Sequence, residues 1–368
     1  MMLTRTRTVL VALAMLAAPV AAYHRTTPPI VQLTTSGEHS LPRVQAGGRR
    51  LVLALEVGGQ QIFRQDRVHN TFEQITTSGD NMNPTVSANG DVLAWDVDCD
   101  GVIGCADSGE QVFRWARGTV QQITHDPTGT SSNPALSGTG ARLAFESLSD
   151  LAGTGNAGVR QIFRVDKTGL FTQISHGAAD SRNPALDKGG LAVVFESSND
   201  QGGNDTGVTQ VWLSTIHGTS RLTAGAGPSS RPAISSDGRV LAFESQADLL
   251  GDGHDTGVNQ VFAYDLRNAL LSQLTNDLAG CSGVSVQRIP KDWSIGYVCH
   301  GEGLFRHLVA KQTFRIPVDG GDTQQSLTEL GAHFMVISTT ANLFGGGTTP
   351  EHQIYMLNLF KLPAVPVS

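Results

Sequence analysis

An acidic segment in the first third of the chain has the spacing of a calcium-binding loop. It runs from residue 96 to residue 107, with carboxylates at positions 1, 3, 5 and 12 and a glycine at position 6. The four acids are Asp96, Asp98, Asp100 and Asp107. Carboxylate oxygens around a tight glycine turn are what Ca²⁺ requires in an EF-hand-like loop. The segment is therefore the candidate metal site of this sequence.

Two features of the same segment favour a simpler interpretation. Asp96 also belongs to a repeated series of acids within strands, which would point its side chain away from the loop. Asp107 is shorter than the glutamate that usually ends a calcium loop. Because Cys99 and Cys105 lie inside the segment, we favour a solvated acidic hairpin pinned by a disulfide, with Ca²⁺ as the alternative. No other cofactor is indicated.

An acid recurs near the end of five similar apolar segments, and we interpret it as structural. The series is Glu56, Asp96, Glu146, Glu196 and Glu244. A pair of such acids could perform acid–base catalysis, but a group present in five units is more typical of a scaffold. In three units an arginine follows in the next strand, where a cross-strand ion pair would fit antiparallel neighbours. These arginines are Arg64, Arg114 and Arg164.

Polar residues beside a repeated proline form the candidate partner-binding set. They are Arg43, Asn83, Asn133, Arg182, Asn183 and Arg231. If the first strand of each unit lines a central channel, these groups ring one mouth of that channel. The alternative is that the asparagines simply satisfy backbone amides in turns.

The elements that must position these residues repeat along the chain. Each unit has a proline-started strand, a glycine turn, an apolar strand that ends near the acid, a strand that opens with glutamine, and a short polar strand. The prolines are Pro42, Pro84, Pro134, Pro184 and Pro232, which are 42, 50, 50 and 48 residues apart. Four short strands at a period of roughly 40–50 residues are typical of a β-propeller blade.

Two degenerate units follow Cys281, so the sequence predicts an all-β protein with seven blades of four antiparallel strands. The first run, residues 30–34, has the sequence of a fourth strand but no blade before it. We expect it to complete the last blade, because this pairing would close the ring and remove an exposed sheet edge. No segment has a sustained helical apolar period with caps.

The repeat resembles the WD40-like PD40 repeat of the TolB-type β-propellers. The resemblance is carried by Asn-Pro-Ala-Leu-Ser-x-x-Gly-x-x-Leu-Ala-Phe-Glu-Ser, which begins at Asn133, and by Gln-Ile-Phe in the next strand. It covers essentially the whole mature chain. It implies a propeller fold, and a channel mouth that accepts partner peptides.

The first 22 residues have the pattern of a secretory signal peptide, with Arg5 and Arg7 before an apolar run and small residues before Tyr23. Residues 23–368 would then form a single propeller domain in the periplasm or outside the cell. The net charge of −7 is unlike that of a nucleic-acid-binding protein. We expect a monomer without a transmembrane segment in the mature chain.

Export permits disulfides, and the four cysteines fall into two local pairs. Four cysteines allow three connectivities, and proximity favours Cys99–Cys105 and Cys281–Cys299. A metal site built from these cysteines is less favoured, because neither pair has CxxC spacing and no histidine is placed to complete a set.

The sequence supports functions of two different classes. The first is an exported, non-enzymatic scaffold that binds an envelope or extracellular protein, a peptide or a small ligand at the channel mouth. The second is a carbohydrate-active lyase or hydrolase with its site in the channel. The uniform repeats, the scattered histidines and the lack of a GxSxG motif favour the first, and we assign no catalytic residue.

Overall fold

The computed structural model shows a chain built from antiparallel sheets. The residues that it describes are 30–32, 39–44, 50–56, 59–67, 69, 71–100, 102, 104–126, 130–155, 158–200, 205–253, 257–289, 291–315, 330–331, 334–341, 348–358 and 365–366. Within them, strands β1 to β29 group into seven sheets, which we number blades one to seven in chain order. None of these residues forms a helix with the length and apolar character needed to cross a membrane.

In blades one to five, four strands follow one another outward in chain order. The first strands are β2 (His39–Val44), β6 (Asn81–Val86), β10 (Ser131–Leu136), β14 (Ser181–Leu186) and β18 (Ser229–Ile234). The second strands are β3 (Arg50–Glu56), β7 (Val92–Asp98), β11 (Arg142–Ser147), β15 (Val193–Asn199) and β19 (Val240–Ser245). The third strands are β4 (Gln60–Asp66), β8 (Glu110–Ala116), β12 (Gln161–Asp166), β16 (Asp205–Thr215) and β20 (Gln260–Asp265). The fourth strands are β5 (Thr71–Gln74), β9 (Thr119–Gln122), β13 (Phe171–Gln173), β17 (Gly218–Arg221) and β21 (Leu270–Gln273).

Blade six contains a fifth strand that the sequence did not predict. Its order is β22 (Cys281–Ile289), β23 (Asp292–Cys299), β24 (Glu302–His307), β25 (Gln312–Arg315) and β29 (Val365–Pro366). The chain thus returns near its end, and β29 pairs with the outer edge of β25. This pairing covers an edge that would otherwise present unpaired backbone groups.

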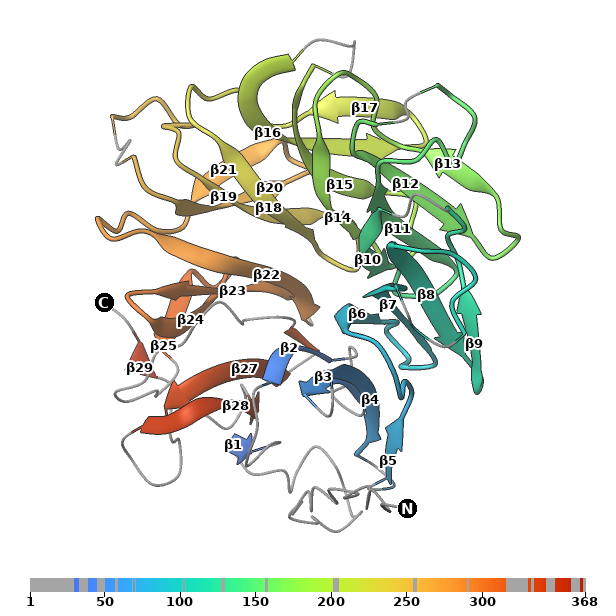
Figure 1. Ribbon diagram of the computed structural model, residues 1–368. Coiled ribbons are helices and arrows are strands. Elements are labelled where there is room, and N and C mark those ends of the chain that lie inside the picture. Colours follow the sequence, from blue (N-terminus) through green and yellow to red (C-terminus); the bar gives the residue numbers. More distant parts are fainter. Residues whose placement is uncertain are drawn as a thin grey trace, which may run out of the picture.

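Blade seven joins the two ends of the chain. It contains β26 (Leu330–Gly331), β27 (Phe334–Ala341), β28 (Thr348–Asn358) and β1 (Ile30–Gln32). Strand β1 lies antiparallel to β28, with Ile30 opposite Leu357 (Figure 1). The predicted completion of the last sheet by the N-terminal strand is therefore confirmed.

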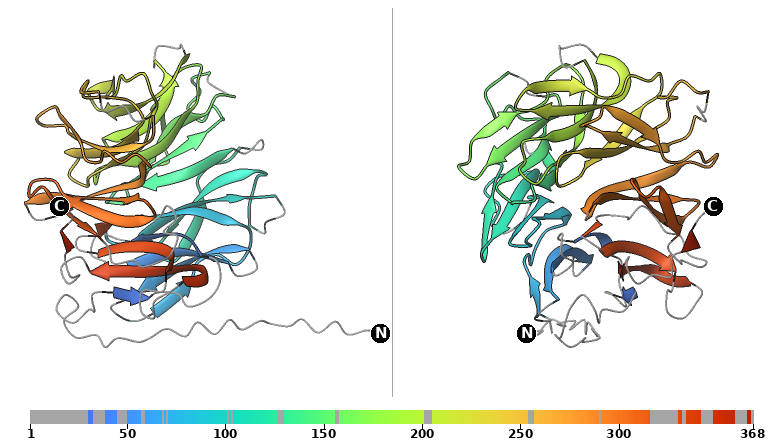
Figure 2. Two further views of the ribbon diagram at one scale, coloured as in Figure 1. Left: turned by 90° about the vertical axis from the view of Figure 1, so that its left-hand side faces the viewer. Right: turned by 180° about the vertical axis from the view of Figure 1, so that it is seen from behind.

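The blades are arranged around a centre, with their first strands innermost (Figure 1; side and rear views in Figure 2). Each innermost strand contacts the innermost strand of the next blade, from β2 through β6, β10, β14 and β18 to β22. The apolar core lies between blades rather than in one centre. Leu93 and Trp95 of blade two, for example, pack with Val52 and Ile62 of blade one. Burial on both sheet faces explains why the second strands are apolar at nearly every position.

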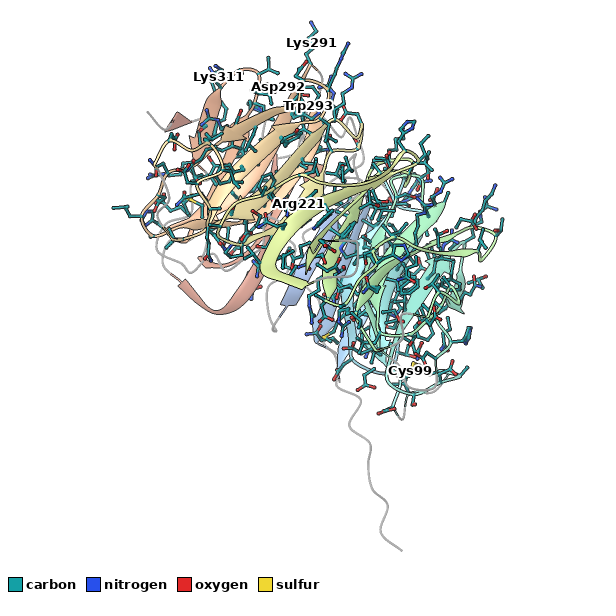
Figure 3. The ribbon with its side chains drawn as sticks, turned by 90° about the horizontal axis from the view of Figure 1, so that it is seen from above. Cys99, Arg221, Lys291, Asp292, Trp293 and Lys311 are labelled. Atoms are coloured by element: carbon teal, nitrogen blue, oxygen red, sulfur yellow. A yellow bond between two sulfur atoms is a disulfide. The ribbon has the colours of Figure 1, made fainter. Side chains whose placement is uncertain are left out.

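Both predicted disulfides are present. Cys99 is bonded to Cys105, and Cys281 is bonded to Cys299. The first lies in the loop between β7 and β8, and the second joins β22 to β23. Figure 3 shows Cys99, in the loop between a second and a third strand, at one end of the molecule. The turn around Lys291 and Trp293, between a first and a second strand, lies at the other end. The predicted signal peptide, residues 1–22, lies outside the described residues.

Candidate functional site

A β-bulge shapes the innermost strand of blades one to six. In blade three, Ser132 faces Glu146 and Ala135 faces Ala144, so Asn133 and Pro134 together oppose one residue of β11. The equivalent register shifts occur in β2, β6, β14, β18 and β22. Proline is tolerated there because a bulge leaves a residue outside the hydrogen-bond ladder.

In blades two to five, the residue before the proline adopts a left-handed backbone conformation, which sequence reasoning missed. Its φ is 48° at Asn83, 52° at Asn133, 53° at Asn183 and 49° at Arg231. Asparagine tolerates this region better than most residues, and glycine accepts it freely. Blade six places Gly283 at the equivalent point, with φ 72°. The repeated Asn-Pro therefore encodes the bulge itself.

The left-handed residues turn their side chains onto the repeated acid of the same blade. The Nδ2 atom of Asn133 donates to Glu146 Oε1 over 2.8 Å, and Asn183 donates to Glu196 over the same distance. Asn83 donates to Asp96 over 3.2 Å. In blade five, the guanidinium of Arg231 lies 3.9 Å from Glu244.

Three of the acids also accept a hydrogen bond from the next blade. The backbone N–H of Asn183 donates to Glu146 over 2.8 Å, that of Arg231 to Glu196 over 2.6 Å, and that of Gly283 to Glu244 over 2.9 Å. Asn133 also donates its amide to Asn183 Oδ1 over 3.0 Å, which links blades three and four. The acids thus join neighbouring blades, in agreement with their interpretation as structural groups.

The residue before the glutamine that opens the third strand is a further partner of the repeated acid. Sequence reasoning overlooked this position. Arg160 lies 3.6 Å from Glu146, and Asn259 donates to Glu244 over 3.0 Å. The position in blade two holds Glu110, whose negative charge acts on Asp96. An alignment of the repeats at this position would have revealed the variation.

We call Asp96, Glu146, Glu196 and Glu244 the ring of acids. Burial raises the pKa of three of them, Asp96, Glu146 and Glu244. The pKa of Asp96 rises to about 7, mainly through desolvation, although the Asn83 amide opposes the shift. Desolvation also raises the pKa of Glu146 and Glu244. The hydrogen bond from Asn133 opposes the shift at Glu146, and the positive charge of Arg231 opposes it at Glu244. One oxygen of Asp96, Oδ1, is buried without a hydrogen-bond partner.

Two arginines of the predicted set carry exposed guanidinium groups. The side chains of Arg182 and Arg231 are each 49% exposed, whereas Asn83, Asn133 and Asn183 are half-buried. Arg182 pairs with Asp180 over 2.6 Å at the surface, where an ion pair is worth little and can be exchanged. The backbone of Arg43 lies in β2 after the bulge of blade one, and its side chain lies outside the description.

The four acids of the candidate calcium loop are not brought together in the described part of the chain. Asp96 lies in β7 and points to Asn83, while Asp98 Oδ1 accepts the backbone N–H of Asp100. Asp100 accepts the N–H of Gly109, and Asp107 lies 3.0 Å from His125. Each carboxylate therefore has a protein partner of its own, as in the disulfide-pinned hairpin.

The expected pairing of the repeated acids with the third-strand arginines is wrong where it can be examined. Arg114 donates to the carbonyl of Gly140 over 2.9 Å, and Arg164 to that of Gly190 over 3.2 Å. Both carbonyls belong to the first hairpin of the next blade, on the face opposite the bulges. Arg64 pairs with Glu73 instead, and the side chain of Glu56 lies outside the description. The long guanidinium reaches across the blade interface, which a pairing argument within one blade cannot capture.

A scan against protein-family models and a search of curated proteins found no match. Solved structures do match. An oligogalacturonate lyase from Vibrio parahaemolyticus is 12% identical, covers 91% of this chain and 94% of that chain, and gives a TM-score of 0.59. The β-propeller domain of the Trilobed protease from Pyrococcus furiosus is 9% identical, covers 88% and 96%, and gives a TM-score of 0.57. The chain is a β-propeller.

The predicted propeller fold is therefore confirmed, and identities this low show the fold alone. TolB from Acinetobacter baumannii also matches, with 13% identity over 85% of this chain and a TM-score of 0.48. This propeller chain spans 64% of the length of that TolB.

Proposed function

We propose that this β-propeller is an exported, non-enzymatic scaffold that binds a protein or peptide segment at the channel mouth. The observation that carries the proposal is the pair of exposed guanidinium groups, Arg182 and Arg231, which project from the innermost strands of adjacent blades. Both strands contain a bulge, and they contact each other. The two arginines therefore sit on a rigid support, which lowers the entropy lost on binding.

The charges at the mouth favour a partner that carries carboxylates. The acids of the ring already accept hydrogen bonds from asparagine amides and from the next blade, so their role is to hold the blades together. Among the described side chains of the predicted set, the exposed charged groups are the guanidinium donors of Arg182 and Arg231. An arginine guanidinium binds a carboxylate through two parallel hydrogen bonds, and such charge-assisted bonds are among the strongest that a surface can offer.

The repeat itself supplies a matched variant for the test. Asparagine occupies the position of Arg231 in three other blades, and serine occupies the position of Arg182 in blades one, three, five and six. Arg182→Ser/Arg231→Asn should therefore keep the fold while it removes both cations. We expect the variant to bind a short peptide rich in aspartate and glutamate about tenfold more weakly or worse, measured by isothermal titration calorimetry.

Two controls accompany this measurement. A lysine-rich peptide of equal length should bind neither protein, and a pull-down from an envelope fraction should recover less partner with the variant. Equal acidic-peptide binding by both proteins would contradict the channel-mouth proposal. Release of unsaturated products from oligogalacturonate, lost in the same variant, would instead establish the enzymatic alternative.

Export is tested separately, because it does not depend on the mouth. We expect the protein made in a bacterial host with its own N-terminus to appear in the periplasm or medium and to begin at about Tyr23. Edman sequencing of the purified protein checks this result. A cytoplasmic protein that retains residues 1–22 would contradict it.

A further inference from the structure

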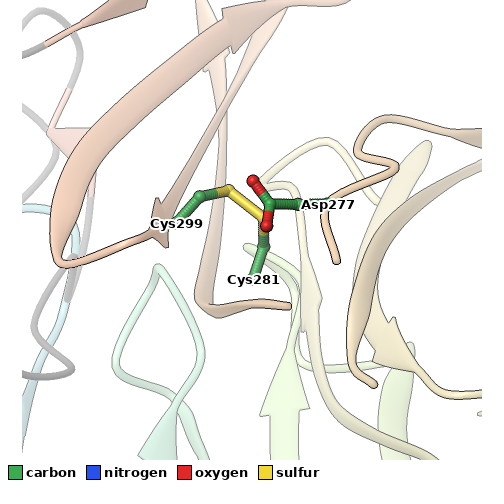
Figure 4. A group of neighbouring side chains, drawn as sticks. All are labelled: Asp277, Cys281 and Cys299. Carbon is green, nitrogen blue, oxygen red and sulfur yellow. A yellow bond between two sulfur atoms is a disulfide. The ribbon is translucent and has the colours of Figure 1, made fainter. Parts of the chain in front are cut away.

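Three side chains gather where blades five and six meet. Cys281, Cys299 and Asp277 place one sulfur or oxygen atom each within 4.8 Å of one another (Figure 4). The two cysteines lie directly opposite each other in β22 and β23, with a Cα–Cα distance of 4.4 Å, and their sulfurs form the disulfide. Asp277 reaches them from the loop after β21.

A histidine adjoins this group through Asp277, outside the set whose ligand atoms converge within 4.8 Å. His300 follows Cys299, and its Nε2 atom lies 2.6 Å from Asp277 Oδ2. The residue has a left-handed backbone, with φ 53°, which turns the chain at the end of β23. Two sulfurs, one imidazole nitrogen and one carboxylate oxygen are donors that Zn²⁺ accepts in a tetrahedral site.

We propose that reduction of the Cys281–Cys299 disulfide converts this group into a Zn²⁺ site with Cys281, Cys299, His300 and Asp277 as ligands. The reductant is a dithiol, which gives two electrons and two protons and itself becomes a disulfide. The S–S bond breaks and two thiols form. Zn²⁺ then replaces the two thiol protons, which are released to solvent, because only thiolates ligate the metal.

The sheet keeps the two cysteines in place when the S–S bond is absent. The pairing of β22 with β23 continues on both sides of the bulge, through Ser282 opposite Val298 and Ser285 opposite Gly296. At a Zn–S distance of about 2.3 Å, tetrahedral ligands require the sulfurs to move apart by only ~1.5–2 Å, which side-chain rotation can provide.

Burial divides the group into an inner and an outer half. Cys281 and Cys299 are buried, whereas the side chain of Asp277 is 23% exposed and that of His300 is 60% exposed. The ion can therefore approach from the solvent side and meet the carboxylate and imidazole first. The sulfurs behind them are shielded from water, which favours a stable metal–thiolate bond.

The other disulfide provides an internal comparison. Cys105 also has a histidine–aspartate pair nearby, since His125 lies 3.0 Å from Asp107. Within the described residues, however, those groups do not converge on the sulfurs as the Asp277 group does. The proposal is thus specific to blade six, and Cys99→Ser/Cys105→Ser gives a background in which only one cysteine pair can be reduced.

The test uses Co²⁺ as a spectroscopic probe in this background. The protein is reduced with dithiothreitol, freed of reductant without oxygen, and titrated with Co²⁺ and then with Zn²⁺. We expect one Co²⁺ per chain, with the intense visible bands and sulfur charge-transfer absorption of a tetrahedral thiolate site, and displacement by Zn²⁺. The oxidised protein should bind neither ion at this site.

Two ligand variants separate a built site from metal capture by loose thiols. His300→Ala and Asp277→Ala leave both cysteines in place, and each should weaken Co²⁺ binding by about tenfold to a hundredfold. Zn²⁺ should raise the melting temperature of the reduced background protein but not that of the oxidised one. An octahedral Co²⁺ spectrum would overturn the proposal. Equal Co²⁺ binding by the background protein and the His300→Ala variant would also overturn it, and so would unfolding of the chain on reduction.

Discussion

Replacement of Glu146 by alanine is expected to lower the free energy of unfolding by about 3 kcal/mol or more. Glu146 is only 4% exposed, and it accepts hydrogen bonds from the amide of Asn133 and the backbone N–H of Asn183. Arg160 lies 3.6 Å away. Alanine would leave two donors and a largely buried cation without their acceptor, at the interface between blades three and four.

The charge and the shape of Glu146 can be separated with glutamine. Glu146→Gln keeps the Oε1 acceptor, to which both Asn133 and Asn183 donate, but loses the charge opposite Arg160. We therefore expect a cost between those of the wild type and the alanine variant. Chemical denaturation followed by tryptophan fluorescence gives the three free energies. The order alanine, glutamine, wild type in rising stability is the expected result.

An exposed glutamate provides the control for this series. Glu302 pairs with Arg315 over 3.0 Å, and both side chains are well exposed, at 37% and 50%. Glu302→Ala should therefore cost no more than about 1 kcal/mol. A similar loss in Glu302→Ala and Glu146→Ala would show that the ring of acids does not join the blades.

The strands were predictable from the sequence because each has a local signal. The glycine turns, the apolar second strands and the glutamine that opens the third strand recur in every clear unit. The glutamine also has a local role, since Gln161 accepts from Ser175 and donates to Gly177 in the turn that follows its own hairpin. Even the pairing of β1 with β28 could be expected, because an unmatched fourth strand and an incomplete last unit fit each other.

The contacts between blades were not predictable in the same way. Glu146 and Asn183 belong to blades three and four, and Arg114 and Gly140 to blades two and three, so no single repeat contains both partners. The left-handed Asn133 was hidden for a different reason. A residue before proline normally favours an extended backbone, and only the bulge register reveals the exception. His300 and Asp277 meet because two separate loops end at the same corner of blade six.

The second large effect concerns Asp96, whose replacement by asparagine should stabilise the protein at alkaline pH. Burial raises the pKa of Asp96 from 3.8 to about 7 in the folded state, so the folded protein holds a proton that the unfolded chain releases. Stability from this group is complete below about pH 4 and is lost as the pH rises to about 7. A shift of roughly three units corresponds to at most about 4 kcal/mol.

The asparagine side chain resembles the protonated carboxyl group, because it is neutral and carries one acceptor oxygen and one hydrogen-bond donor group. It can still accept the amide of Asn83 and cannot be ionised beside Glu110. We therefore expect Asp96→Asn and the wild type to be about equally stable near pH 4. At pH 8 the variant should be more stable by about 1–3 kcal/mol, as measured by urea denaturation across this range.

Asp166 is the matched control, because its pKa shifts in the opposite direction. Hydrogen bonds from Thr168 lower the pKa of this exposed carboxyl group, so the folded state favours its charged form. Asp166→Asn should then reduce stability at neutral pH and lose that effect in acid. Opposite pH dependences of the two asparagine variants would show that the effect comes from burial of Asp96 and not from the loss of any one negative charge. Burial of Asp96 would then be what lowers the free energy of unfolding at alkaline pH. A pH profile of Asp96→Asn that runs parallel to that of the wild type would contradict this account, since it would mean that Asp96 is already ionised in the folded protein.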